Sequence, residues 1–376
     1  MTATLNVGLI GSGYMGKAHA IAYHAAPRVF ALPAQPVCAL LAEADATLAT
    51  HQAAALGFAR ATDDWQTLVA DPAIDVVDIC APNALHEPMA LAAIAHGKHV
   101  YVEKPLALNA ASAERLREAA ARAGVKTLVG FNYLRNPATQ LAREIVVSGE
   151  IGELVHFRGR HNEDYLADPA TPHSWRTRRD MAGSGALGDL GSHILNLAEY
   201  LCGQTITALC ADLQTLIRQR PLAQGSGLGT VENDDQAQAL LRFSAGLVGN
   251  LETSRIASGR KLGLSYTLTG SRGAIVFDQE RMNELQLYRQ VGPAGRRGFT
   301  TLLTGPEHPD YAAFSPAPGH GLGYNDQKII EVRDLVEGLC GQRELYPDFG
   351  HAWRINHLID AIERSHRTRG WVDLDA

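Results

Sequence analysis

Over residues 1–130, short apolar runs alternate with longer stretches that are rich in Ala and Leu. The apolar runs have the length of buried strands: Leu5–Ile10, Pro36–Ala42, Asp75–Cys80, His99–Glu103 and Thr127–Gly130. The stretches between them have helical spacing: Met15–Ala25, Ala46–Leu56, Ala84–Ala95 and Ala110–Ala123. Several are followed by a glycine where a left-handed C-cap is needed: Gly57, Gly97 and Gly124. This alternation predicts stacked βαβ units and a doubly wound parallel sheet.

The pattern changes after Asn136–Pro137. The next predicted elements are a helix to about Ser148, a strand from Glu153 to about Asn162 and a helix from Leu187 to Cys202. Residues 205–289 then alternate apolar and polar positions between turns, which predicts a large open, mainly antiparallel sheet. Residues 290–325 are rich in Gly and Pro and are interpreted as a long irregular loop. Two predicted helices close the chain: Asp326–Leu339 and Ala352–Arg364.

The length of 376 residues indicates two domains. We expect an α/β domain over residues 1–131 and an α+β domain over residues 132–376 that binds substrate and forms oligomer contacts. The C-terminal helices are candidates to pack back onto the first domain. Two domains also make a cleft between them the expected place for a ligand.

Composition and charge exclude several classes of partner. Hydrophobic residues make up 46% of the chain and charged residues 20%, as in globular proteins with a full core. The net charge is −6 and Lys and Arg form no run, so nucleic acid and anionic membranes are not expected partners. The run Leu5–Ile10 follows no basic region and is far shorter than the roughly 20 residues that span a bilayer. We therefore expect no signal peptide, no membrane segment and a cytoplasmic location.

Five cysteines are scattered through the chain without a C-x-x-C pair: Cys38, Cys80, Cys202, Cys210 and Cys340. We interpret them as core thiols in a reducing compartment.

A glycine-rich turn follows the first predicted strand directly and opens the first predicted helix. Its residues are Gly11-Ser12-Gly13-Tyr14-Met15-Gly16, which match G-x-G-x-x-G. Gly11 would allow the tight turn, Gly13 the close approach of a pyrophosphate, and Gly16 close packing of helix and strand. Phosphates would bind the helix N-terminus, where free N–H groups and the helix dipole favour negative charge. The motif predicts a dinucleotide-binding Rossmann domain; a glycine-rich turn without a ligand is the alternative.

Glu43, at the end of the second predicted strand, decides which dinucleotide is expected. A carboxylate at this position accepts hydrogen bonds from the ribose hydroxyls and repels a 2′-phosphate, so NAD is expected rather than NADP. Asp45 is better placed as the N-cap of the next helix. The alternative for Glu43 is a surface charge without a ligand.

Four further motifs follow in order: Ala81-Pro82-Asn83 with His86, Glu103-Lys104-Pro105, Trp175-Arg176, and Gly188-Asp189-Leu190-Gly191-Ser192-His193. With the glycine turn they resemble the Gfo/Idh/MocA oxidoreductases, which include glucose–fructose oxidoreductase, inositol dehydrogenases and glycoside 3-dehydrogenases. The resemblance extends from Leu5 to about Val372. It also implies a homo-oligomer, a dimer or tetramer, because the family commonly pairs its open sheets between subunits.

Lys104, Asp189 and His193 are the candidate catalytic residues. Lys104 follows the C-terminal end of a parallel strand, where doubly wound sheets bind ligands, and a cation there can stabilise alkoxide charge. Asp189 and His193 are spaced i, i+4 on a predicted helix and share one face. A neutral imidazole is a suitable base for the alcohol proton, and the resemblance assigns this role to His193. The alternatives are a surface lysine, and a helix N-terminus with an ordinary half-buried histidine.

The resemblance also implies contacts to cofactor and substrate. The cofactor candidates beyond the glycine turn and Glu43 are Ala81, Pro82, Asn83, His86, Glu103, Lys104, Asn132, Trp175 and Arg176. The substrate candidates beyond the catalytic residues are Tyr133, Asn162, Asp164 and Tyr165. A core tryptophan beside a surface arginine is the alternative for Trp175-Arg176, and a solvated loop is the alternative for residues 161–165. No metal site is expected there, because no H-E-x-x-H or Cys/His pairing supports one. The acidic run at residues 232–235 is interpreted as the solvated entrance of the next strand.

The motifs predict an NAD-dependent oxidoreductase, and the resemblance implies that it oxidises a secondary hydroxyl of a sugar, anhydrosugar or cyclic polyol, such as an inositol, to the ketone. Hydride would pass to C4 of NAD while His193 accepts the hydroxyl proton and Lys104 and Asp189 fix the substrate. Two rivals remain open. One is an enzyme of the same fold that recycles bound NAD internally, in isomerisation or redox-assisted glycoside cleavage. The other is a non-catalytic regulator that senses NAD.

Overall fold

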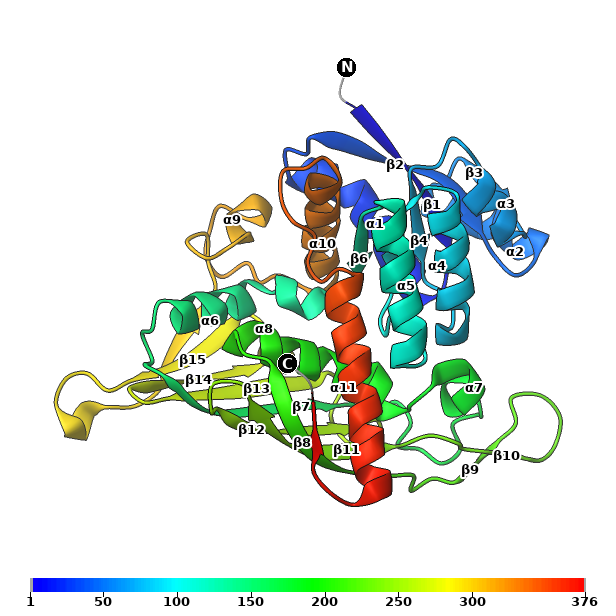
Figure 1. The fold of residues 1–376 in the computed structure, drawn as a ribbon. Coiled ribbons are helices and arrows are strands. Elements are labelled where there is room, and N and C mark those ends of the chain that lie inside the picture. The colour runs from blue at the N-terminus through cyan, green and yellow to red at the C-terminus, as the bar shows by residue number, and fades with distance from the viewer. Residues whose placement is uncertain (1–2, 375–376) are drawn as a thin grey trace. The chain divides into compact units, whose positions relative to one another are not determined.

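The computed structural model describes residues 3–374, which form two compact units (Figure 1). The first unit extends to Arg135 and also includes Gly323–Asn356. The second unit comprises Asn136–Leu322 and the chain from His357 onward. The first unit is therefore built from two segments that are far apart in the sequence.

In the first unit, six parallel strands form one sheet in the order β3-β2-β1-β4-β5-β6. The strands are β1 Ala3–Ile10, β2 Ala34–Ala42, β3 Arg60–Thr62, β4 Val76–Ile79, β5 His99–Val102 and β6 Thr127–Val129. The predicted doubly wound parallel sheet is confirmed. The strand order reverses between β1 and β4, and ligands of such sheets bind outside the carboxyl ends of the strands at this point.

The helices of the first unit are α1 Tyr14–Val29, α2 Ala46–Leu56, α3 Trp65–Ala70, α4 His86–Ala95, α5 Ala110–Ala123 and α10 Tyr324–Leu339. Asp45 caps α2 by accepting from the amide of Leu48, as predicted, and Gly57 and Gly124 are left-handed C-caps. The pattern did not predict β3 or α3, because β3 has only three residues, lies at the sheet edge and has no apolar run. Helix α10 packs against α1, so a C-terminal helix belongs to the first unit.

In the second unit, nine strands form one sheet in the order β16-β15-β14-β13-β7-β12-β11-β8-β17. The strands are β7 Leu154–Asn162, β8 Ile206–Gln214, β11 Gln236–Phe243, β12 Val248–Ser254, β13 Gly263–Gly270, β14 Gly273–Asp278, β15 Glu284–Arg289, β16 Thr300–Leu303 and β17 Val372–Asp373. Only the β7–β12 pair is parallel among these neighbours, so the prediction of a mainly antiparallel sheet is confirmed. A separate hairpin consists of β9 Gln219–Pro221 and β10 Leu228–Thr230.

The second unit also contains helices. They are α6 Pro137–Val147, α7 Arg179–Ala182, α8 Ser192–Cys202 and α9 Tyr311–Phe314; α11 Phe349–Thr368 begins in the first unit and ends in the second. Helix α8 contacts β7 and helix α6 contacts β14 and β15. Leu195 and Leu197 of α8 are fully buried, as in a helix that covers a sheet.

Three predictions need correction. The helix predicted from Leu187 begins as a π-turn over Leu187–Gly191, and regular α-helix starts only at Ser192. The loop predicted over residues 290–325 contains β16, paired with β15, and α9. Not all cysteines are core thiols: all five are free, but Cys340 is exposed, and Cys80 and Cys210 are partly exposed. In residues 3–374, no helix has the length and apolar character needed to cross a bilayer.

Candidate active site

The glycine turn is packed against protein at two of its glycines and open at the third. Gly11 has a φ of +91°, and a Cβ there would lie 2.7 Å from the carbonyl oxygen of Cys80. A Cβ on Gly16 would lie 2.0 Å from the carbonyl oxygen of Gly11. By contrast, no described atom lies within 4 Å of a Cβ built on Gly13. Gly13 is the N-cap of α1 and no side chain caps that helix, so the N–H groups at its start face the open side and fit a pyrophosphate.

Glu43, just beyond the end of β2, is joined to this turn. Its Oε1 accepts hydrogen bonds of 2.5 Å from both the amide and the hydroxyl of Ser12, and its Oε2 accepts one of 3.0 Å from the amide of Ala44. The carboxylate is half-buried and lies beside the phosphate turn. This is where a ribose-binding carboxylate is needed, and it is more than an isolated surface charge.

Lys104 follows β5 in the same unit and is partly buried. Its amide donates a hydrogen bond of 3.2 Å to Oε2 of Glu103, which is buried. His86 is also buried, with one ring nitrogen 2.9 Å from the carbonyl oxygen of Pro105 and the other 2.9 Å from that of Ala81. Burial lowers the pKa of His86. Its ring lies between the loops after β4 and β5 and joins them.

Two candidates after β6 are also buried in the first unit. Asn132 is 2% exposed, and its Nδ2 is a buried donor with no hydrogen-bond partner among residues 3–374. A buried donor without an acceptor is unfavourable, so this amide fits a group that a ligand supplies. Tyr133 packs edge-on against Tyr324 of α10, with 6.2 Å between the ring centroids.

A buried ion network beneath Lys104 was not predicted from the sequence. The ring of His19, on α1, lies between two carboxylates: Nδ1 is 2.8 Å from Oδ2 of Asp78, and Nε2 is 2.9 Å from Oε1 of Glu103. The ammonium of Lys328, on α10, lies 2.7 Å from Oε1 of Glu103 and 2.7 Å from Oε2 of Glu331. Because Glu103 precedes Lys104 directly, this network anchors the backbone at the candidate lysine.

The charges in this network follow from its contacts. Burial is the largest single effect on His19 and lowers its pKa, but the charge and hydrogen bond of Asp78, with smaller effects, together raise the pKa well above 6.5. Burial would raise the pKa of Glu103, but Lys328 and His19 lower it. Cys80 lies beside His19 and Asp78 and could complete three metal ligands in the described range. Burial raises the pKa of Cys80 to about 12, so its thiol is neutral beside the pair of His19 and Asp78.

In the second unit, the structure brings together Tyr165, Asp189, His161 and His193. Asp189 lies on the π-turn, and its Oδ2 accepts a hydrogen bond of 2.8 Å from the hydroxyl of Tyr165. His193 lies on the first turn of α8 and is buried, with its ring centroid 5.5 Å from that of His161. Asp189 therefore lies in the π-turn and His193 in the α-helix that follows it directly, four residues later.

His161 is the residue of this group that was not selected as a site candidate. It is 1% exposed; its Nδ1 lies 3.0 Å from the carbonyl oxygen of Leu190 and its Nε2 3.1 Å from Oε1 of Glu163. Residues 161–165 are therefore not a simple solvated loop. The polar run after the strand was the signal in the sequence, but only the pairing of β7 with β12 and β13 shows that His161 points inward.

The other substrate and cofactor candidates of this unit lie nearer the surface. Asn162 donates to Glu252 at 2.6 Å, and Asp164 accepts from Lys261 at 2.7 Å. Trp175 is half-buried and the exposed Arg176 stacks over its ring, 4.4 Å from the ring centroid. The alternative of a core tryptophan is therefore wrong, and the Trp175–Arg176 pair presents a flat, cationic surface.

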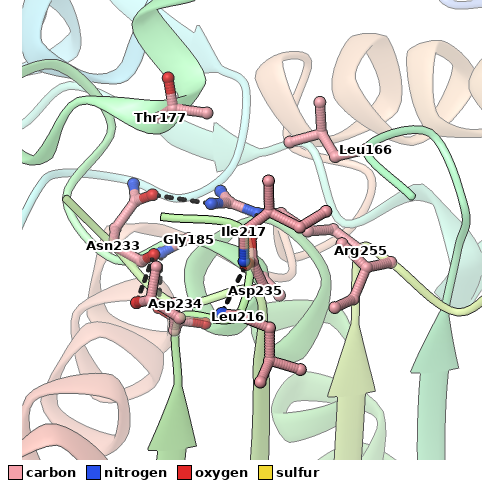
Figure 2. A network of polar contacts seen from close by, with 12 residues as sticks. Leu166, Thr177, Gly185, Leu216, Ile217, Asn233, Asp234, Asp235 and Arg255 are labelled. Carbon is pink, nitrogen blue, oxygen red and sulfur yellow. Dashed lines mark hydrogen bonds and ion pairs between the residues drawn. The ribbon is translucent and has the colours of Figure 1, made fainter. Parts of the chain in front are cut away.

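The acidic run before β11 is a solvated entrance only at Glu232, which is exposed, and its other three residues are buried. Asn233, Asp234 and Asp235 are 2%, 5% and 0% exposed, and together with Arg255 they form the polar network in Figure 2. These three residues can be buried because their side chains form hydrogen bonds and ion pairs with other segments of the chain.

Comparison with protein families agrees with this arrangement. Residues 5–131 match the model described as an oxidoreductase family with an NAD-binding Rossmann fold. Residues 139–276 match the model of the GFO/IDH/MocA C-terminal domain.

Individual proteins match over two thirds or nearly all of the chain. Levoglucosan dehydrogenase of Pseudarthrobacter phenanthrenivorans is 41% identical over 98% of each chain. A levoglucosan dehydrogenase structure in complex with NADH and levoglucosan has a TM-score of 0.96 and covers 99% of this chain and 100% of that one. An NAD binding oxidoreductase from Klebsiella pneumoniae is 48% identical, with a TM-score of 0.95 over 100% of both chains. The NAD-dependent scyllo-inositol 2-dehydrogenase of Bacillus subtilis is 30% identical over 66% of each chain.

Proposed function

The chain belongs to the GFO/IDH/MocA oxidoreductase family, with an NAD-binding Rossmann domain, and from this premise we propose that it oxidises a secondary hydroxyl of a sugar. It is an NAD-dependent dehydrogenase of the sugar and polyol class. An anhydropyranose such as levoglucosan is the first candidate substrate. The observation with the most weight is the similarity to levoglucosan dehydrogenase, because it extends over both the unit with the glycine turn and the unit with Asp189 and His193.

The first unit would hold the cofactor. The amides at the start of α1 bind the pyrophosphate at Gly13, and Glu43 accepts from the ribose hydroxyls, which then compete with Ser12 for its oxygens. Asn132 offers its free amide donor to the bound dinucleotide. NAD, when bound, supplies the acceptor for the hydride.

The second unit would hold and deprotonate the sugar. The Tyr165 hydroxyl donates to Oδ2 of Asp189 and orients its carboxylate. A carboxylate accepts several hydrogen bonds, so Asp189 can also accept one from a sugar hydroxyl. His193 accepts the proton of the reacting hydroxyl, as an imidazole can near neutral pH. Lys104 donates to the same substrate oxygen and stabilises its developing negative charge. The hydride leaves the carbinol carbon as the carbonyl forms, so charge and protons balance.

The predicted homo-oligomer is supported by one face of the large sheet. Leu240 and Val248 on neighbouring strands expose large apolar side chains on the same face, 56% and 47% exposed. Exposed apolar side chains on a sheet face are suited to pairing with a second copy. Light scattering of the purified chain measures this directly, and a monomer at micromolar concentration would contradict it.

The function is tested by the absorbance of reduced nicotinamide. The purified protein is mixed with NAD or NADP and with levoglucosan, pyranoses, glycosides and inositols in turn. We expect NADH to form with one sugar class, and Lys104→Ala and His193→Gln to reduce kcat by about a hundredfold or more while NAD still binds. NADPH formation without NADH would overturn the cofactor assignment.

If no sugar in the panel produced NADH or NADPH, the dehydrogenase proposal would be rejected. Two further observations would then distinguish internal recycling of NAD from NAD sensing. NAD that stays bound through purification, with conversion of a glycoside and no net NADH, would indicate internal recycling. NAD binding without conversion of any sugar would indicate a sensor.

A further inference from the structure

Asp234 accepts hydrogen bonds from three successive backbone amides at the start of residues 185–193, the segment that contains Asp189 and His193. Its Oδ1 lies 2.6 Å from the amide nitrogen of Gly185, and its Oδ2 lies 2.8 Å from that of Leu187. The backbone carbonyl of Asp234 accepts from the amide of Ala186 at 2.9 Å. One buried residue therefore satisfies all three N–H groups, which neither the π-turn nor a local side chain could do.

The neighbours of Asp234 tie this point to the loop that contains Trp175. Asn233 donates through Nδ2 to the carbonyl oxygens of Arg176 at 3.0 Å and Gly183 at 3.3 Å. Arg255 donates to Oδ1 of Asn233 at 3.0 Å (Figure 2). It also donates to Oδ1 of Asp235 at 3.0 Å and to the carbonyl oxygen of Arg176 at 3.2 Å. The planar fork of a guanidinium makes these contacts in several directions at once.

Asp235 anchors the other side of the network. Its Oδ2 accepts from the amides of Leu216 at 2.9 Å and Ile217 at 2.8 Å, on the chain that follows β8 (Figure 2). Asp235 is 0% exposed and Arg255 is 1% exposed, so this ion pair is held without water. A paired and fully hydrogen-bonded buried charge resists displacement, because its partners would be left unpaired.

The backbones also approach each other too closely for any other residue at position 185. A Cβ on Gly185 would lie 1.9 Å from the carbonyl oxygen of Asp234 and 2.8 Å from Nη1 of Arg255. The start of the segment from Gly185 to His193 is thus in close contact with the network and is hydrogen-bonded to it.

We propose that Asp234 is a positioning residue for the dehydrogenase reaction, which with Asn233, Asp235 and Arg255 fixes the segment that contains Asp189 and His193. The proposal rests on the proposed function only for the roles of Asp189 and His193. Asp234 itself acts through the backbone: it sets where the π-turn begins, and the π-turn sets the directions of both side chains. The same network fixes the carbonyl of Arg176, and so links the cofactor candidate to the catalytic segment.

The variant Asp234→Asn tests this with almost no change in volume. Burial raises the pKa of Asp234, and the amides of Leu187 and Gly185 and the charge of Arg255 offset this only in part. Asparagine keeps one side-chain acceptor, but its NH₂ group faces the second backbone amide. Because two N–H donors cannot bond to each other, one hydrogen bond at the start of the segment is lost. Asp234→Ala removes both side-chain acceptors. Ser365→Ala is the matched control, because it removes a buried hydroxyl of the same unit that bonds to Gly370 and Ala211 instead.

Two measurements are made on each full-length variant. Amide hydrogen exchange by mass spectrometry, without substrate, reports peptides that cover residues 183–193. We expect exchange there to be faster by about tenfold in Asp234→Asn and by more in Asp234→Ala, and to be unchanged in Ser365→Ala. Steady-state oxidation of levoglucosan with NAD should show kcat lower by about tenfold to a hundredfold in Asp234→Asn, with the KM for NAD within about twofold.

The outcomes separate this proposal from the proposed function. Unchanged exchange over residues 183–193 in both Asp234 variants would overturn the positioning role, whatever the activity. Faster exchange with unchanged kcat in an active enzyme would also overturn it. An equal loss of kcat in Ser365→Ala would mean that general destabilisation, and not positioning, limits the rate. In a further outcome, wild type oxidises no sugar while the amides of residues 183–193 still exchange faster in Asp234→Asn than in wild type. The proposed function then fails, but Asp234 is still shown to fix the backbone of this segment.

Discussion

The hydroxyl of Tyr165 donates a hydrogen bond of 2.8 Å to Oδ2 of Asp189, and this bond orients the carboxylate. Burial and the Asp189 charge raise the pKa of Tyr165 well above 10, so the hydroxyl keeps its proton over the working pH range. Hydrogen bonds to charged groups contribute about 1.5–3 kcal/mol. We expect Tyr165→Phe to lower kcat/KM for the sugar by about tenfold to a hundredfold, because each 1.4 kcal/mol is about a factor of ten.

The matched control is Tyr200→Phe, which removes a hydroxyl that donates to Oε1 of Gln140 at 2.9 Å in the same unit. Steady-state kinetics on both variants check the prediction. Equal kinetics for Tyr165→Phe and wild type would show that Asp189 needs no such support.

Glu43 should determine the preference for NAD. The change Glu43→Gln keeps the shape but removes the charge that repels a 2′-phosphate. We expect the ratio of kcat/KM for NADP to that for NAD to rise by about tenfold, which corresponds to about 1.4 kcal/mol. Asp45→Asn is the control, since Asp45 caps α2 two residues later and should leave this ratio unchanged. A preference for NAD that survives Glu43→Gln would remove Glu43 from the cofactor site.

Gly13 and Gly16 should respond differently to the same added methyl group. At Gly13 no described atom lies within 4 Å of the new Cβ, so Gly13→Ala should fold with unchanged thermal stability. Its Kd for NAD should rise by about tenfold or more, because the methyl group occupies the side that the pyrophosphate approaches. At Gly16 the new Cβ would lie 2.0 Å from the carbonyl oxygen of Gly11. Gly16→Ala should therefore lower the stability of the fold, by about 1–3 kcal/mol.

Calorimetry with and without NAD distinguishes the two variants. If Gly13→Ala bound NAD as tightly as wild type does, the glycine turn would not be the pyrophosphate site.

The His19 network should make stability depend on pH. The pKa of His19 is raised in the folded chain above its ordinary value of 6.5, because burial lowers it less than Asp78 and smaller effects together raise it. The contribution of His19 to the free energy of unfolding is therefore complete below its unfolded pKa of about 6.5. Between this value and the higher folded pKa, it decreases by about 1.4 kcal/mol for each pH unit. The pKa of Glu103 is lowered instead, chiefly by Lys328 against the effect of burial, so its contribution is lost only as the pH falls below about 4.5.

Urea unfolding as a function of pH checks this for wild type, His19→Gln and the exposed control His24→Gln. We expect His19→Gln to be less stable by about 3–5 kcal/mol near pH 6, because it leaves buried carboxylates unpaired. The difference from wild type should narrow as the pH rises, and His24→Gln should follow the wild-type curve. A difference that is constant with pH would show that His19 is neutral in the folded chain.

The amino-acid sequence by itself determined the features that depend on neighbours along the chain. The period of apolar positions predicted the parallel strands around β1 and the antiparallel alternation of β11, because helix and strand each repeat over a few residues. The turn from Gly11 to Gly16 was also readable, since strand, glycines and helix are consecutive. The caps Asp45 and Gly57 are local signals of the same kind.

Only the tertiary structure decided the contacts between residues that are far apart in the chain. Lys328 meets Glu103 across 225 positions, and Asp234 meets Gly185 across 49. In the sequence Lys328 is one polar position on a helix, and Asp234 belongs to an acidic run that looks solvated. Burial changed both interpretations, because a charge out of water must find its partner, and that partner is chosen by which strands and helices pack together rather than by which residues are adjacent.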